Sequence, residues 1–217
     1  MCGIVGYIGN NQAAPFLLDG MSKLEYRGYD SAGIAVYEKG KITVEKCVGR
    51  LDSLRQKLDG HMPEGTMGIG HTRWATHGRP SDRNSHPHTD ASGEFVVVHN
   101  GIIENYLVLK EDLIAKGHKF VSETDTEVVA HLMAAYYDGD FEETVKRVLR
   151  VIDGSYSLVF MCAKEPEKII CTKKDNPLVI GLGEGENFIA SDIPAIIAKT
   201  RRTFIMSDGE IATVTKD

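Results

Sequence analysis

The sequence lacks the features that mark membrane-spanning, secreted or disulfide-stabilised proteins. No run approaches the roughly 18 apolar residues of a transmembrane helix, and the opening MCGIVGYIGNNQ has no basic start followed by a long apolar stretch, as a secretory signal would. The four cysteines, Cys2, Cys47, Cys162 and Cys171, form no Cys-x-x-Cys pair, which is typical of reduced thiols in the cytosol. We therefore expect a cytoplasmic protein with no membrane partner.

Basic residues are outnumbered by acidic ones. The chain has 25 Lys and Arg against 31 Asp and Glu, a formal net charge of −6, whereas nucleic-acid partners require a basic face. No repeat, low-complexity segment or Pro/Gly-rich linker divides the 217 residues. With 42% hydrophobic residues, a chain of this length can bury a core without a metal or disulfide. We expect one domain, residues 1–217, and no nucleic-acid partner.

Hydrophobic patterning predicts strands in two groups, with helices clustered between them. Such a pattern favours antiparallel sheets covered by helices over a parallel, doubly wound sheet. The predicted helix caps are Asn10 or Asn11, Thr124 or Asp125, and Ser191. The predicted helices span 12–24, 51–58, 106–115, 126–137, 141–152 and 193–199. The predicted strands span 2–8, 33–38, 42–48, 67–74, 94–99, 156–163, 168–173, 178–182, 188–190, 204–206 and 211–214.

Cys2 is the first candidate for chemistry, although a cysteine at the start of a strand is most often structural. Removal of Met1, which a small second residue permits, would place a thiol and a free α-amine on one residue. An α-amine has a reference pKa of about 7.7–8.0 and accepts a proton at neutral pH. Cys2 would then carry its own base, as in N-terminal-nucleophile catalysis.

The run His99-Asn100-Gly101 closes an apolar strand and has two interpretations. Asn-Gly is the strongest signal for a type I′ hairpin turn, although no matching short strand follows it. Alternatively, the Asn side-chain amide and the Gly N–H converge on one oxygen and form an oxyanion hole. The local sequence leaves both open.

The run HTRWATHG at 71–78, followed by SHPH at 85–88, concentrates histidines. Their spacings of 6, 9 and 2 residues match no zinc motif, so we expect no metal. A purely structural loop remains open. An Arg flanked by hydroxyl and imidazole groups is better suited to a carboxylate, which Arg73 can bind with two hydrogen bonds. Trp74 would cover such a ligand.

Two further runs lie at element boundaries. SETDTE at 122–127 suits a helix cap, or else the carboxylate of Asp125 pairs with a cationic ligand group. EYRGYDSAG at 25–33 is too short for a phosphate-binding Walker A loop. Together the candidates provide a thiol, an oxyanion hole, a carboxylate-binding Arg and an ammonium-binding Asp. Such a set suits an α-amino acid whose side chain meets the thiol.

These motifs resemble those of a known family over essentially the whole chain. MCGIVGYIG, EYRGYDSAG, HTRWATHG, HPH, VVVHNGIIEN, SETDTE and PLVIGLGEGENFIASD are similar to the glutaminase domains of glutamine–fructose-6-phosphate aminotransferases (isomerising), which are class II, N-terminal-nucleophile amidotransferases. The resemblance implies an α+β fold, a four-layer αββα sandwich of two antiparallel sheets (the N-terminal nucleophile hydrolase fold).

The resemblance also implies roles for particular residues. Cys2 would be the nucleophile and its α-amine the base. Asn100 and Gly101 would form the oxyanion hole. The remaining residues would form the substrate-binding part of the site. Arg73 would bind the glutamine α-carboxylate, with Thr76, His77 and His86 nearby, and Asp125 would bind the α-ammonium. Trp74 would lie in the loop that closes over glutamine, and Arg27 in a loop near the nucleophile.

The activity that the resemblance implies is hydrolysis of L-glutamine to glutamate and ammonia through a Cys2 γ-glutamyl thioester, with no cofactor. In the full-length family members, two sugar-isomerase domains use the ammonia to make glucosamine 6-phosphate from fructose 6-phosphate; those domains are absent from these 217 residues. The full-length enzyme is expected to be a homo-oligomer. The alternatives are the glutaminase domain of another class II amidotransferase, or a non-catalytic amino-acid-binding module.

Overall fold

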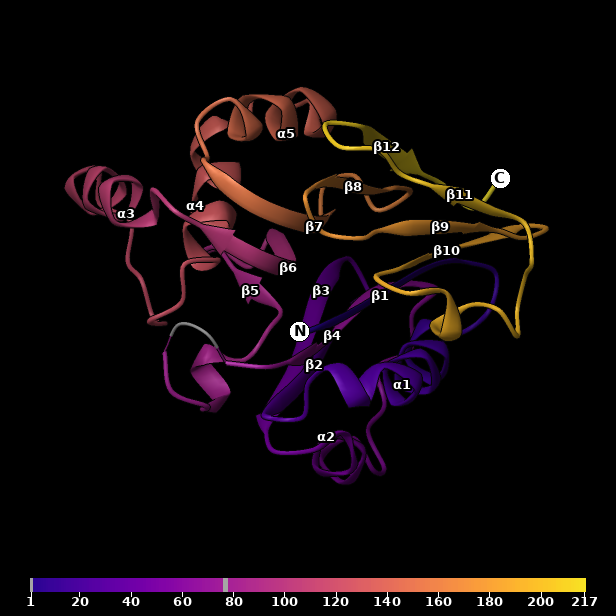
Figure 1. Cartoon of the computed structure of the whole chain (residues 1–217). Coiled ribbons are helices and arrows are strands. Elements are labelled where there is room, and N and C mark those ends of the chain that lie inside the picture. The colour runs from indigo at the N-terminus through magenta and orange to yellow at the C-terminus, as the bar shows by residue number, and fades with distance from the viewer. Residues whose placement is uncertain (1, 76–77) are drawn as a thin grey trace.

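A computed structural model describes residues 2–75 and 78–217, which form two antiparallel sheets between helical layers (Figure 1). The first sheet has the order β11 (Thr203–Ile205), β9 (Val179–Leu182), β10 (Glu186–Ala190), β1 (Gly3–Gly9), β4 (Met67–Arg73), β2 (Ser31–Glu38) and β3 (Lys41–Val48). The second has the order β12 (Ile211–Val214), β8 (Ile169–Lys174), β7 (Gly154–Cys162), β6 (Phe95–Ile103) and β5 (His88–Thr89).

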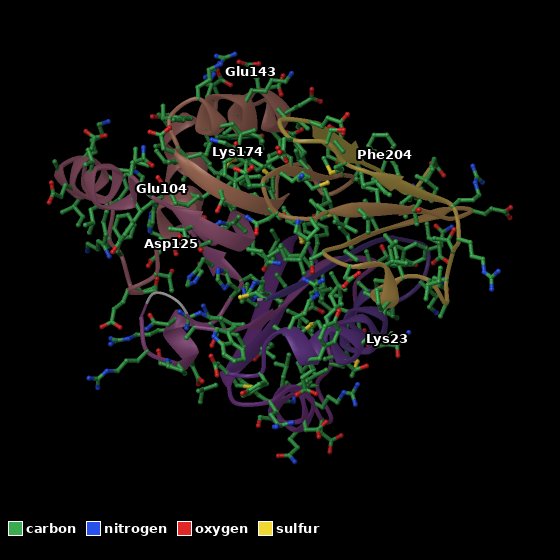
Figure 2. All side chains as sticks on the ribbon, in the orientation of Figure 1. Lys23, Glu104, Asp125, Glu143, Lys174 and Phe204 are labelled. Atoms are coloured by element: carbon green, nitrogen blue, oxygen red, sulfur yellow. The ribbon has the colours of Figure 1, made fainter. Side chains whose placement is uncertain are left out.

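Helices cover the outer face of each sheet (Figure 1). In Figure 2, Lys23 on α1 and Glu143 on α5 mark the two opposite outer layers. The first sheet is covered by α1 (Ala13–Leu24) and α2 (Leu51–Lys57), and the second by α3 (Tyr106–Ala115), α4 (Glu127–Tyr136) and α5 (Phe141–Leu149). Within residues 2–75 and 78–217, three short 3₁₀ helices complete the fold, namely η1 (Glu25–Arg27), η2 (Asp82–Asn84) and η3 (Ile193–Ala195).

Three apolar clusters separate these layers, and this confirms the predicted αββα sandwich. One lies between α1, α2 and the first sheet, one between the two sheets, and one between the second sheet and α3–α5. Strand residues alternate between two faces, so Ile4 and Ile8 of β1 enter the middle cluster whereas Val5 and Tyr7 face α1. Among the described residues, no helix is long and apolar enough to traverse a bilayer.

Several local predictions are confirmed. The helix predicted at 106–115 matches α3, and the Lys39-Gly40 turn joins β2 to β3. Both turn residues have positive φ, 49° and 85°, as a two-residue hairpin loop with a type I′ turn requires. The chain reverses there because glycine tolerates this conformation and the apolar pattern resumes immediately afterwards.

The predicted N-caps are wrong, and the side chains of Asn11 and Asp125 bond to distant groups instead. Asn11 donates to Glu186 at 3.2 Å, and α1 begins after Gln12 without a side-chain cap. The Asp125 carboxylate accepts from the Ile103 N–H at 2.8 Å, while the N-cap of α4 is Thr126, again without a side-chain bond.

The helix predicted at 193–199 is also wrong. Only η3 forms there, and it is capped by Asp192, whose carboxylate accepts from the Ile193 N–H. The predicted cap, Ser191, instead accepts the Ile4 N–H at 3.0 Å and so joins β10 to β1. Its hydroxyl is therefore used in the sheet that carries Cys2.

Candidate active site

A cavity of about 310 Å³ opens at the end of the sandwich where β1 begins and β4 ends. Its size is within the range of small-molecule sites. In Figure 2, Asp125 lies at this end, away from Phe204 on β11. The lining residues are Cys2, Arg27, Arg73, Trp74, His86, His99, Asn100, Gly101, Ile102, Thr124, Asp125, Thr126, Ser155, Asn176 and Pro177.

Eight of the ten predicted site residues therefore lie around one cavity. They come from the residue before β1, from η1, from the end of β4 and the residue after it, from β6, and from the segments before α4 and β5. Thr76 and His77, the other two, fall outside the described residues. The predicted residues that line the cavity are thus as much as 123 positions apart in the sequence, from Cys2 to Asp125.

The Cys2 thiol lies against the backbone of Trp74. The Trp74 N–H donates to Sγ at 3.2 Å, and the Trp74 carbonyl oxygen lies 3.5 Å from the same sulfur. Burial raises the pKa of the Cys2 thiol, while the Trp74 N–H bond and the nearby Arg73 charge act in the opposite direction. A thiol in this setting requires a proton acceptor before it can attack.

Asn100 and Gly101 lie within β6, so the hairpin-turn interpretation is wrong. The strand continues to Ile103, and its register with β7 pairs Asn100 with Ser157 and Gly101 with Tyr156. The Asn100 side chain faces the space between the sheets, where its Nδ2 donates to the Cys2 carbonyl oxygen at 3.0 Å. An amide donor is thus beside the residue that carries the thiol.

The backbone conformation at position 101 requires glycine. Its φ is 128°, in the region that favours glycine, and a Cβ there would lie 2.0 Å from the Ser155 carbonyl oxygen. Only glycine therefore allows β6 to continue past Asn100 next to β7.

Arg73 and Asp125 provide opposite charges in the same cavity. Both are buried, at 3% and 4% exposure, and Arg73 Nη2 donates to the Gly78 carbonyl oxygen at 3.3 Å. Burial lowers the pKa of Arg73, opposed by the charges of Cys2, Asp30 and Asp125, but the group remains a cation. The Asp125 carboxylate is held by the Ile103 N–H. A ligand with separated anionic and cationic groups would match this pair.

His86 and His99 line the cavity, and His71 and His88 pack against His86 behind it. The rings of His71 and His86 lie 4.1 Å apart, and those of His86 and His88 lie 4.6 Å apart. Thr126 Oγ1 bonds both His86 Nε2, at 3.0 Å, and His99 Nδ1, at 2.9 Å. Burial lowers the pKa of His86 and of His88 well below the ordinary value, so both rings are neutral at pH 7.

Arg27 and Trp74 form part of the rim of the cavity. The Arg27 guanidinium pairs with Asp192 at 2.5 Å, which fixes it beside the cavity. The Trp74 side chain is half exposed and packs edge-on against Tyr29, with ring centroids 5.4 Å apart. Gly28 allows these segments to approach, because a Cβ there would lie 2.7 Å from the Arg73 carbonyl carbon.

The sequence interpretation missed several residues that build this site. Asp30 accepts the Ala75 N–H at 2.7 Å and so holds the segment after Arg73. Glu127 accepts from the N–H groups of Val121 and Ser122, and this orders the segment that carries Asp125. Asp30 is part of EYRGYDSAG and Glu127 of SETDTE, so the motifs contained the signal without revealing the partners.

Comparison with known proteins agrees with this geometry. A family model described as a glutamine amidotransferase domain matches residues 71–198, more than half of the chain. Glutamine–fructose-6-phosphate aminotransferases (isomerising) of Caldanaerobacter subterraneus subsp. tengcongensis and Clostridium tetani are 58% and 56% identical over 217 residues. The match covers 100% of this chain but 36% of each relative, so the chain spans about a third of their length.

Solved structures share the fold. A glutamine phosphoribosylpyrophosphate amidotransferase from B. subtilis superposes with a TM-score of 0.80 at 26% identity, covering 100% of this chain and 49% of that one. A glutamine aminotransferase class-II domain protein from Silicibacter pomeroyi superposes with a TM-score of 0.66 at 14% identity, covering 99% and 95% of the two chains, and supports the fold alone. On the family match, the extended identity and the shared αββα sandwich, the chain belongs to the glutamine amidotransferase domain family.

Proposed function

We propose that residues 1–217 form a glutaminase domain that hydrolyses L-glutamine to glutamate and ammonia at Cys2. The observation that carries the proposal is the convergence of the Cys2 thiol, the Asn100 amide, the Arg73 guanidinium and the Asp125 carboxylate on one cavity. Each corresponds to one part of glutamine: the amide carbon, the amide oxygen, the α-carboxylate and the α-ammonium.

Binding rests on the two buried charges. Arg73 presents a planar fork of N–H donors that matches a carboxylate. Asp125 accepts from a protonated α-amine and already has its orientation set by the Ile103 N–H. With both ends held, the glutamine side chain extends toward Cys2, and the reaction becomes effectively unimolecular.

The chemistry divides into two displacements. The Cys2 thiolate attacks the amide carbon, and the N–H groups of Asn100 and Gly101 stabilise the resulting oxyanion. The C–N bond then breaks, and the leaving nitrogen takes a proton from the base and departs as ammonia. Water attacks the γ-glutamyl thioester, the C–S bond breaks, and glutamate and the free thiol are regenerated.

The base in this proposal is the α-amine of Cys2, exposed by removal of Met1. Two of the neighbouring imidazoles are bonded elsewhere: His71 Nε2 to Asn100 Oδ1 at 3.0 Å and His86 Nε2 to Thr126 Oγ1 at 3.0 Å. Their pKa values are also lowered by burial, which makes them poor proton acceptors at neutral pH. The α-amine has a reference pKa near neutrality and belongs to the same residue as the thiol.

The ammonia acceptor is proposed from the relatives. Because two curated relatives that are 58% and 56% identical are named glutamine–fructose-6-phosphate aminotransferases and are almost three times as long, this domain would supply ammonia to sugar-isomerase domains that bind fructose 6-phosphate. Glucosamine 6-phosphate would be the product of the longer, homo-oligomeric enzyme, and the cytoplasm its compartment.

The test compares two preparations of the chain that differ only in Met1, checked by mass spectrometry. The processed form should release ammonia from glutamine, and a glutamine-like electrophile should alkylate Cys2. The form that retains Met1 should do neither at a comparable rate, because its α-nitrogen at Cys2 is an amide. Equal rates in the two forms would disprove the N-terminal-nucleophile mechanism. Glutamine binding without ammonia release from the processed form would indicate an amino-acid-binding module.

A further inference from the structure

His71 and Asn100 meet across the space between the two sheets. His71 lies on β4 in phase with Met67 and Ile69, which enter the cluster between the sheets. Asn100 lies on β6 in phase with Val96 and Val98, which enter the same cluster from the other side. Because strand side chains alternate, both polar residues point into this interior at the end nearest Cys2.

The His71 ring nitrogen Nε2 faces two oxygens. It lies 3.0 Å from Asn100 Oδ1 and 3.0 Å from the His99 backbone carbonyl oxygen. A carbonyl oxygen can only accept, so Nε2 must carry the proton. The opposite tautomer would place a nitrogen lone pair against both oxygens, which is repulsive.

His71 is held neutral in this tautomer. Its side chain is fully buried, and burial lowers its pKa to about 3. Its Nδ1 has no hydrogen-bond partner among residues 2–75 and 78–217. A second proton on Nδ1 would therefore leave a buried N–H unbonded, whereas the neutral ring leaves only a lone pair there.

The hydrogen bond determines which way the Asn100 amide points. The oxygen and nitrogen of an Asn side chain are nearly equal in size, so packing alone does not distinguish the two orientations. With Oδ1 facing His71, Nδ2 faces Cys2 and donates to its carbonyl oxygen at 3.0 Å. The flipped amide would present an oxygen to the cavity instead of a donor.

We propose that His71 is a positioning residue that fixes the Asn100 amide with its N–H groups toward Cys2. This inference rests on the proposed glutaminase function, in which Asn100 stabilises the oxyanion. His71 touches no reacting atom in this scheme and takes no proton. Its contribution is to keep the Asn100 N–H groups facing the cavity, where the flipped amide would place an oxygen.

Two substitutions at position 71 separate donor loss from loss of packing. His71→Gln places an amide N–H near the position of imidazole Nε2, whereas His71→Leu has a similar size and no donor. Thermal unfolding first establishes that both variants are folded. His71→Leu should then lower kcat about tenfold to a hundredfold with KM for glutamine within about threefold, and His71→Gln should retain kcat within about threefold. Equal kcat losses in the two variants, or a His71→Leu kcat within twofold of the unsubstituted chain, would overturn the proposal.

A double-mutant comparison tests whether His71 acts through Asn100. Adding His71→Leu to Asn100→Ala should cause no further fall in kcat, because the group being positioned is already gone. A further fall of tenfold would show that His71 acts independently and would refute the proposal. The acid limb of the pH profile of kcat/KM should persist in His71→Gln, since the base is elsewhere; loss of that limb would identify His71 as the base.

The tautomer itself can be measured without any turnover. Imidazole ¹⁵N chemical shifts of the folded chain should show His71 protonated at Nε2 and unprotonated at Nδ1 throughout pH 5–8. A proton on Nδ1, or titration within this range, would refute the inference. Absence of ammonia release from the unsubstituted chain would instead count against the proposed function, so the two failures are distinguishable.

Discussion

The backbone N–H of Trp74 donates to the sulfur of Cys2, 72 residues away in the sequence. The bond forms where β1 begins and β4 ends, since the antiparallel register pairs Gly3 with Thr72. The segment after Arg73 is therefore anchored to the thiol at Trp74 and to Asp30 at Ala75. Binding groups and the nucleophile are connected through one short stretch of backbone.

Replacement of the Cys2 thiol tests the nucleophile. Cys2→Ala should reduce ammonia release about a thousandfold or more, because the other three cysteines, Cys47, Cys162 and Cys171, do not line the cavity and cannot form the thioester there. Binding of glutamine, followed by calorimetry, should persist, since Arg73 and Asp125 are unchanged. The matched control is Cys47→Ala, which removes a free, half-buried cysteine on β3, outside the cavity. Activity of Cys2→Ala within tenfold of the unsubstituted chain would rule out the assignment.

Arg73→Lys tests recognition of the α-carboxylate. Lysine keeps the positive charge but replaces a two-pronged donor with a point charge, so KM for glutamine should rise about tenfold or more. Steady-state kinetics measures the change. Arg150→Lys, at an exposed position after α5, is the control and should leave KM unaltered. An unchanged KM in Arg73→Lys would contradict the proposed contact.

Gly101→Ala tests the backbone requirement in β6. A Cβ would meet the Ser155 carbonyl oxygen at 2.0 Å, so β6 and β7 must separate locally. We expect both a large fall in the unfolding midpoint and loss of ammonia release. Gly93→Ala is a matched control, because Gly93 also has positive φ (73°) but nothing lies within 4 Å of its Cβ position. That variant should lose only about 1–2 kcal/mol, the cost of the left-handed backbone. Equal destabilisation by the two substitutions would show that the contact with Ser155 is unimportant.

The buried histidines predict a pH dependence of stability. Burial lowers the pKa of His71 to about 3 and that of His86 and His88 well below the ordinary value. In the unfolded chain these groups bind protons near pH 6.5, so the unfolded state holds more protons below that pH. The free energy of unfolding should therefore be highest above pH 7 and fall by about 1.4 kcal/mol per pH unit for each histidine as the pH drops toward 5.

Urea titrations at pH 5.5, 6.5 and 7.5 measure this dependence. Replacing His88, which does not line the cavity, by Gln should reduce the slope between pH 5.5 and 6.5 by the larger part of one proton. A midpoint that is equal at pH 5.5 and 7.5 would contradict the argument, as would an unaltered slope in His88→Gln.

Short-range sequence patterns predicted most of the elements, because periodicity and turn chemistry are local properties. The Lys39-Gly40 hairpin and the helix at 106–115 needed no knowledge of the rest of the chain. The predicted caps were wrong for the opposite reason. Ser191 bonds Ile4, 187 positions away, and Asn11 bonds Glu186, 175 positions away. A polar side chain near a helix start gives no local indication that its partner lies in another strand.

In the candidate site too, motifs in the sequence predicted some residues, whereas others depend on contacts that only the folded chain provides. Motif resemblance selected Cys2, Arg73, Asn100 and Asp125, and the fold brings all four to one cavity; their roles remain predictions. The supporting residues were not selected, because His71 and Glu127 act through neighbours that only the folded chain provides. The choice between a turn and a strand at Asn100-Gly101 depended on pairing with β7, which is also a tertiary property.

The division of the site between the two sheets has a consequence for how the chain regains activity after denaturation. Arg73 belongs to the seven-stranded sheet and Cys2 directly precedes its strand β1, whereas Asn100 belongs to the five-stranded sheet. A species with either sheet formed alone would hold only some of these groups and would not form the cavity. During refolding, ammonia release should therefore recover only once one sheet has docked on the other, and it should not precede the recovery of far-ultraviolet circular dichroism, which follows strand and helix formation.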